Sequence, residues 1–164
     1  MKYCKTTTQN HPVSLAHKIC LEDINTLIIE EGYSETNPLF TNNEIVINLD
    51  KAKKIIAKSK GINEEKSVDM AFGLTHGDSS TNEMLMVELK FNYVNNLKNL
   101  KMDSLKGKIR DSKNLLTELL PISNEYIFIF KTNHIEEAKN KFFRAGFARN
   151  FIVMDISKLK EIYF

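Results

Sequence analysis

Two acidic residues and one lysine occupy positions where the sequence otherwise has the pattern of β-strands. Asp69 is flanked by alternating large apolar residues over 68–74, and Glu88 and Lys90 are flanked in the same way over 86–91. Successive side chains of a strand point to opposite faces, so the apolar residues of each run share one face. The three ionic residues therefore lie on the other face of their strands.

The polar segment 75–82 between the two runs predicts a hairpin that brings the acids together. A turn centred near Asp78 places Asp69 opposite Glu88, and the Cβ atoms of such a pair are about 4.5–5.5 Å apart. Two carboxylates that close repel each other unless a proton or a cation lies between them. Mg²⁺ suits that place, because it is usually held by one or two carboxylates, water and substrate phosphate. Lys90, on the same face, is placed to hold a phosphate.

This arrangement resembles the active site of the PD-(D/E)xK nuclease superfamily, whose members share the restriction-endonuclease-like fold. Asp69 matches the first acidic position of the motif, and Glu88 and Lys90 match its Glu-x-Lys. Val68 stands where the motif has its proline, a position that often varies in the family. The resemblance covers roughly residues 41–156. It implies a Mg²⁺ (or Mn²⁺) cofactor bound by Asp69 and Glu88, with Lys90 orienting the attacking water.

The activity that this resemblance implies is hydrolysis of phosphodiester bonds in a nucleic acid, with DNA favoured over RNA as the partner. A homodimer is compatible with it, because many such nucleases bring two sites to two strands. An alternative is a non-catalytic binding or assembly module of the same fold in a defence or repair complex. A third interpretation is an unrelated α/β fold in which Asp69, Glu88 and Lys90 form a solvated face, where ion pairs contribute only about 0–1 kcal/mol.

Other residues are weaker candidates for the same site. Many members of the family carry a further glutamate on the helix before the aspartate strand, and Glu44 matches that position, although closing a capping box with Thr41 explains it equally well. Glu30 and Glu31 are weaker rivals for the same role. A local excess of basic residues supplies candidate phosphate contacts, with the wet face of a helix as the competing interpretation: Lys98, Lys101, Lys106, Lys108 and Arg110.

Composition fits one domain of 164 residues, with 42% hydrophobic residues and a net charge of only +2. No run of eighteen apolar residues predicts a membrane span, and residues 1–12 lack the apolar stretch of a secretory signal. Cys4 and Cys20 have no metal-ligand spacing. These features predict a cytoplasmic protein with no membrane partner.

The hydrophobic periodicity predicts an α/β fold. The resemblance implies that this fold is the restriction-endonuclease-like one, a mixed central sheet flanked by helices. We expect one domain over 1–164, with an N-terminal helical extension (1–40) before a nuclease-like core (41–156). A strand at 44–49 is a rival to the start of the second helix, because Ile45, Val46 and Ile47 are β-branched. The family's leading strand is not obvious. The expected elements are helices at 15–31, 42–60, 104–120 and 133–146, strands at 66–74, 83–91, 126–130 and 151–156, and a short terminal helix.

Overall fold

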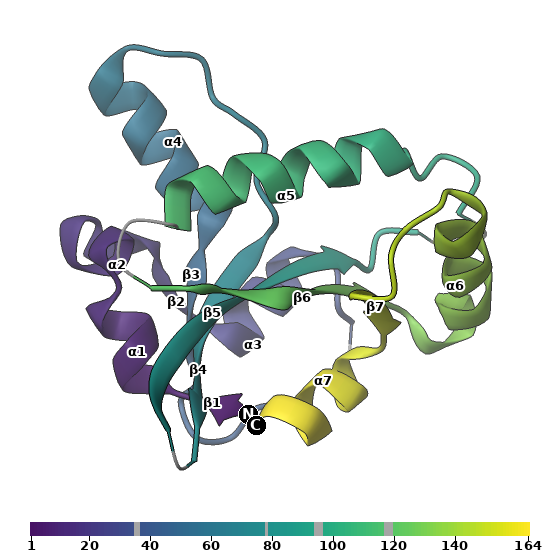
Figure 1. Cartoon of the computed structure of the whole chain (residues 1–164), viewed down its shortest axis with the longest axis horizontal. Coiled ribbons are helices and arrows are strands. Elements are labelled where there is room, and N and C mark those ends of the chain that lie inside the picture. Colours follow the sequence, from purple (N-terminus) through teal and green to yellow (C-terminus); the bar gives the residue numbers. More distant parts are fainter. Residues whose placement is uncertain (35–36, 78, 94–96, 117–119) are drawn as a thin grey trace.

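Seven β-strands form one mixed sheet in the computed structural model of this chain, which is an α/β protein (Figure 1). The structure describes residues 1–34, 37–77, 79–93, 97–116 and 120–164. The strands are β1 (Lys2–Tyr3), β2 (Leu21–Asp23), β3 (Ile45–Asn48), β4 (Met70–His76), β5 (Ser79–Lys90), β6 (Ile122–Phe130) and β7 (Phe151–Met154). Six of them lie in the order β2-β3-β4-β5-β6-β7, and β1 pairs with β4 at Leu74 and Thr75.

The sheet changes from antiparallel to parallel at β5. Strands β2 to β5 are antiparallel to their neighbours, whereas β5, β6 and β7 run parallel. A tight turn can join only antiparallel strands, so the chain reaches β6 through a crossover that contains α5 (Met102–Leu116). The predicted strand at 126–130 and its parallel crossover are confirmed.

Helices cover both faces of the sheet. On one face lie α1 (Lys5–Asn10), α2 (Pro12–Ala16), α4 (Leu49–Lys60), α5 and α6 (Ile135–Arg144), and on the other lie α3 (Ile24–Glu30) and α7 (Ile156–Tyr163). Phe72 and Val87 pack toward α3 and α7, while Ala71 and Met86 pack toward α5. The second face of the hairpin is therefore covered by α5 and is not a wet surface.

The predicted helix at 42–60 is wrong in its first part. Residues Ile45–Asn48 form β3, which pairs with β2 on one side and with β4 on the other. The helix begins only at Leu49, because the Asn48 side chain accepts a hydrogen bond from the amide of Lys51 (2.9 Å) and caps it. The rival strand interpretation was correct for these β-branched residues, which here fill a place in the sheet.

The predicted helix at 15–31 is also wrong in its first half. That segment contains the end of α2, a 3₁₀ turn at Lys18–Cys20 and strand β2 before α3 begins. Asp23 caps α3, by accepting a hydrogen bond from the amide of Thr26 (3.1 Å). Ser14 lies within α2, buried, and donates to the Thr8 carbonyl (2.7 Å). The segment before residue 41 thus carries strands as well as helices.

The predicted hairpin is confirmed, although its first strand begins at Met70 and not at residue 66. Strand β4 pairs Met70 with Val87 and keeps that register as far as Thr75 and Asn82. Asp69 lies one residue before β4, so the same register places it across from Glu88. The predicted turn residue Asp78 lies outside the described residues.

The later elements agree with their predictions to within a few residues. Helix α5 extends the predicted helix by two residues at its start, and residues 117–119 at its predicted end lie outside the described part of the chain. A 3₁₀ turn at Thr132–His134 leads into α6, and β7 is followed by α7. The chain after residue 101 is therefore the part whose order of elements the sequence predicts best.

Gly73 in β4 marks a close approach between α1 and the sheet. A Cβ atom there would lie 2.5 Å from the Cβ of Thr7 and 2.9 Å from the backbone nitrogen of Thr8. We expect Gly73→Ala to lower the free energy of unfolding by about 1–3 kcal/mol, because an overpacked site must move backbone as well as side chains. Urea denaturation followed by circular dichroism measures this change.

Gly107 in α5 is the matched control for Gly73. A Cβ atom at this position would meet nothing within 4 Å. Gly107→Ala should therefore raise the free energy of unfolding by about 0.5–1 kcal/mol, since alanine loses less backbone entropy in a helix. Equal losses of stability in the two variants would contradict the close approach at Gly73.

Candidate functional site

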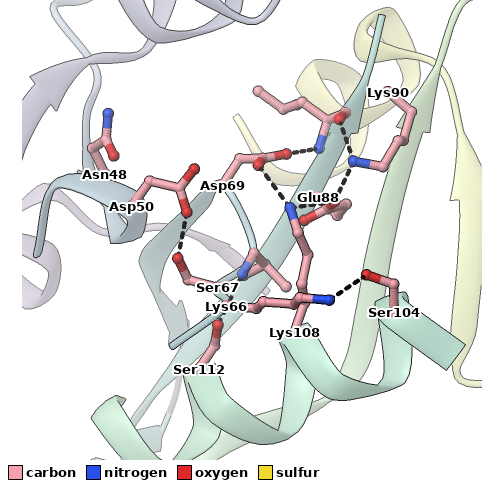
Figure 2. A network of polar contacts seen from close by, with 12 residues as sticks. Asn48, Asp50, Lys66, Ser67, Asp69, Glu88, Lys90, Ser104, Lys108 and Ser112 are labelled. Atoms are coloured by element: carbon pink, nitrogen blue, oxygen red, sulfur yellow. Dashed lines mark hydrogen bonds and ion pairs between the residues drawn. The ribbon is translucent and has the colours of Figure 1, made fainter. Parts of the chain in front are cut away.

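Asp69 and Glu88 lie side by side on the sheet face that α5 covers (Figure 2). Only 4% of Asp69 and 1% of Glu88 is exposed. One carboxylate oxygen of Asp69 accepts a hydrogen bond from the amide of Leu89, which ties the end of β4 to the strand that carries Glu88. The interpretation of these acids as a solvated face is therefore wrong.

Two lysines from different elements face this pair of acids (Figure 2). Lys90, in β5, donates to Glu88 Oε1 and to the Leu89 carbonyl (3.1 Å). Lys108, in α5, donates to the same Glu88 oxygen (2.8 Å) and to Asp69 Oδ1 (3.4 Å). The sequence predicted Lys90 at the site but placed Lys108 only among the phosphate contacts.

Burial, followed by the charge of Asp69, raises the pKa of the Glu88 carboxyl to about 7, against the opposing effects of Lys90 and Lys108. Burial also raises the pKa of Asp69, against the opposing effects of Lys108 and Lys90. Burial lowers the pKa of Lys108, but the charges of Glu88 and Asp69 outweigh it and raise that pKa above its usual value. The protonation of each of these groups therefore depends on the charges of the others.

Two further acids lie beside Asp69. Ligand oxygens of Glu31, Asp50 and Asp69 all lie within 4.8 Å of one another. Glu31 ends α3, and Asp50 lies in the first turn of α4, where it accepts a hydrogen bond from Ser67. Burial, followed by the charges of Asp69 and Asp50, raises the pKa of Glu31. Crowding of this kind favours a cation.

The residues present fit a divalent metal ion. Glu88 Oε2 is buried and, among the described residues, has no hydrogen-bond partner, although its sister oxygen accepts from both lysines. When ionised, the four carboxylates of Glu31, Asp50, Asp69 and Glu88 and the two ammonium groups leave two formal negative charges, which one divalent ion balances. Carboxylate oxygens are the ligands that Mg²⁺ and Mn²⁺ prefer.

A cavity of about 220 Å³ adjoins Glu88 and the two lysines. Its wall includes Glu88, Lys90 and Lys108 together with Lys101, Ser104 and Tyr93. Ammonium and hydroxyl groups on this wall can donate hydrogen bonds, and the acid on the wall is Glu88. The cavity therefore suits an anionic group that has to reach the acids.

Comparison of the chain with protein-family models, curated proteins and solved structures finds no match. Within the described ranges, no helix is both long enough and apolar enough to cross a membrane. The function of this chain is therefore inferred from the geometry of the site.

Glu44 does not join the acids. It lies before β3, at the end of that strand away from Asn48, where its Oε2 accepts a hydrogen bond from the amide of Asn42 (2.8 Å). It is 4% exposed, so it is a buried acid outside the site. Its predicted place on a helix was wrong, because Glu44 directly precedes a strand, β3, and the helix begins only at Leu49.

The predicted basic residues divide between the site and its surroundings. Lys108 is in the site, and Lys101 lies on the cavity wall. Lys106 lies 4.9 Å from the centre of the Phe147 ring, and Arg110 Nε lies 2.9 Å from Asp111 Oδ1. Lys98 is exposed, and its carbonyl accepts from Lys141 (3.2 Å).

Asp50 was not among the residues predicted for the site, and Glu31 was only a weaker candidate. An acid that follows an Asn cap is common at a helix start and is usually explained by the helix dipole. The useful signal was the strand at 45–48, because a helix that begins at Leu49 places Asp50 next to the start of β4. The backbone contact between the Leu49 amide and the Asp69 carbonyl (3.1 Å) fixes that juxtaposition.

Proposed function

We propose that this protein is a Mg²⁺- or Mn²⁺-dependent nuclease of the PD-(D/E)xK type that hydrolyses phosphodiester bonds, with DNA as the favoured substrate. The observation that carries the proposal is the buried pair of Asp69 and Glu88, which shares one sheet face with Lys90 and leaves Glu88 Oε2 without a partner among the described residues. A purely structural ion pair has no need for an unpaired buried carboxylate oxygen, since such an oxygen costs stability.

The order of the elements supports the same proposal. Helix α3 precedes an antiparallel meander of β3, β4 and β5, and α5 then leads to the parallel strand β6. The family core is a helix, a three-strand meander, a helix and a strand. Strand β3 would be the leading strand that was not obvious in the sequence. The proposed restriction-endonuclease-like fold would have α4 as an insertion between β3 and β4.

Asp69 and Glu88 would hold the metal ion, and Glu31 and Asp50 would complete its acidic surroundings. A bound Mg²⁺ or Mn²⁺ supplies charge that offsets the negative charge developing on the scissile phosphate, and it makes an attacking water more acidic. Lys90 would orient that water and donate to an oxygen of the phosphate as negative charge builds up there. Lys101 and Ser104, on the cavity wall, would position the adjoining phosphate.

The test is cleavage of end-labelled DNA and RNA by the purified protein in Mg²⁺, in Mn²⁺ and in EDTA. We expect DNA cleavage in both metals and none in EDTA. Cleavage that continues in EDTA would exclude the proposed metal chemistry. Cleavage of RNA alone would keep the site and change the substrate.

Lys90→Ala should reduce the cleavage rate about 10²–10³-fold, which is the usual loss when one donor to a developing oxyanion is removed. Metal affinity, measured by titration calorimetry with Mn²⁺, should not fall, because the ammonium group is not a ligand. Lys158→Ala is the control, since Lys158 pairs with Glu161 on α7, across the sheet from the site. A Lys90→Ala protein that cleaves as fast as the parent contradicts the assigned role.

One observation favours a second function, that of a non-catalytic binding module. Lys90 and Lys108 together balance the formal charges of Asp69 and Glu88 without any metal. The same fold would then serve as a binding or assembly module in a defence or repair complex. A parent protein that binds neither Mg²⁺ nor Mn²⁺ at millimolar concentration supports this second function over the nuclease.

A further inference from the structure

Lys108 contacts Asp69 and Glu88 from α5, whereas the two acids belong to the hairpin of β4 and β5. It lies in the second turn of α5, 18 residues after Lys90, and its ammonium group lies between Asp69 Oδ1 (3.4 Å) and Glu88 Oε1 (2.8 Å) (Figure 2). Its side chain is 22% exposed, whereas those of Asp69 and Glu88 are 5% and 1% exposed. Lys108 therefore supplies a cation between two carboxylates that would otherwise repel each other.

The oxygens that hold Lys108 are also oxygens that a metal between Asp69 and Glu88 would use. Glu88 Oε1 is shared with Lys90, and the other oxygen of Asp69 accepts from the Leu89 amide. Asp69 Oδ1 is the oxygen of that carboxylate that accepts from Lys108. An ammonium group and a divalent cation on the same oxygens repel each other strongly at this depth.

The side chain of Lys108 can move into the adjoining cavity of about 220 Å³. Lys108 lines this cavity together with Lys101 and Ser104. Lysine has a flexible four-carbon stem, so the ammonium group can turn while α5 stays in place. In the cavity the ammonium groups of Lys108 and Lys101 would lie near each other and repel. A phosphate bound between them would offset that repulsion.

We propose that Lys108 is an internal counter-ion that a divalent metal displaces from Asp69 and Glu88, and that the displaced ammonium group binds a substrate phosphate in the adjoining cavity. This inference rests on the proposed nuclease function. It extends that function, because the position of the Lys108 side chain would link metal binding to phosphate binding. Metal bound without substrate should then compete directly with the Lys108 ammonium group.

The first test is the affinity for Mn²⁺ without nucleic acid, measured by titration calorimetry. We expect Lys108→Met to bind Mn²⁺ about tenfold more tightly than the parent, because the competing cation is gone, where tenfold corresponds to about 1.4 kcal/mol. Lys108→Arg keeps a positive charge and should bind no more tightly than the parent. Lys101→Met is the matched control on the same cavity wall and should leave Mn²⁺ affinity unchanged.

The outcomes of this titration separate the inference from the function on which it rests. If the parent binds Mn²⁺ and Lys108→Met binds it no more tightly, the counter-ion role is wrong and the nuclease proposal stands. If neither protein binds Mn²⁺, both proposals fall. A Lys108→Met protein that binds more tightly supports both.

The second test uses the parent protein alone, so it does not depend on how a variant folds. Amines are acetylated briefly with and without Mn²⁺, and the modified peptides are quantified by mass spectrometry against exposed Lys158. We expect Mn²⁺ to increase labelling of Lys108 severalfold. Adding a short DNA duplex should reverse that increase, and the same duplex without Mn²⁺ should leave the labelling of Lys108 unchanged. Labelling of Lys108 that Mn²⁺ leaves unchanged or lowers would overturn the inference.

Discussion

Replacing Glu88 by glutamine should reduce metal-dependent cleavage at least about 1000-fold. Glutamine keeps the size of the side chain and one carbonyl oxygen, but it removes the negative charge that would hold the metal. A metal ion supplies several kcal/mol of transition-state stabilisation, and each 1.36 kcal/mol is a factor of ten in rate. Because Glu88 is almost fully buried, no solvent-exposed group can take its place easily.

Glu44→Gln is the matched control for Glu88→Gln. Both residues are buried glutamates, at 4% and 1% exposure, but Glu44 lies outside the site. Initial rates of cleavage in Mg²⁺ and in Mn²⁺ should be unchanged in Glu44→Gln and lost in Glu88→Gln. If both variants cleave like the parent, catalysis resides elsewhere in the chain.

The stability of the parent protein in EDTA should fall as the pH rises from about 4.5 to about 7. Burial raises the pKa of Glu88 from 4.5 to about 7. Between these values the folded protein keeps the proton on Glu88 and the unfolded chain loses it, so the folded state binds more protons. Stability then decreases with rising pH and levels off above the folded pKa, by an amount on the order of 3 kcal/mol at most.

The Glu88→Gln protein isolates this contribution, because glutamine has no proton to lose. Urea denaturation of both proteins at pH 5, 6, 7 and 8, in EDTA, gives the difference between their free energies of unfolding. We expect that difference to shift steadily in favour of the glutamine variant up to about pH 7 and then to become constant. Parallel pH profiles for the two proteins would show that Glu88 titrates alike in the folded and unfolded states.

The core of the site was predictable because it is local in sequence. Asp69 and Glu88 are joined by one hairpin, and the alternation of apolar residues fixes which face they share. Helix α5 and strand β6 were also predictable, because the apolar stripe of one and the continuous apolar run of the other are strong patterns. These elements place two acids and Lys90 together with no further information.

The rest of the site depends on contacts between distant segments. Glu31 caps the end of α3, Asp50 lies in α4 and Lys108 lies in α5, and no spacing in the sequence relates them to the hairpin. The wrong prediction of a helix at residues 45–48 has a physical reason as well. β-branched residues just before a helix can extend the helix or form a strand, and here pairing with β2 and β4 makes them a strand. Burial of the hairpin's second face likewise becomes visible only when α5 packs over it.

The two ends of the chain meet at one place in the fold (Figure 1). The Tyr3 ring stacks on that of Phe164 (4.7 Å between centroids), and the Lys2 side chain donates to the carbonyl of Glu161 (3.3 Å). Strand β1 pairs with β4 at Leu74 and Thr75, whereas Asp69 lies before the opposite end of β4. A purification tag or fluorescent label fused to either terminus would therefore stand clear of the acids, and a short peptide joining the termini would allow circular permutation of the chain.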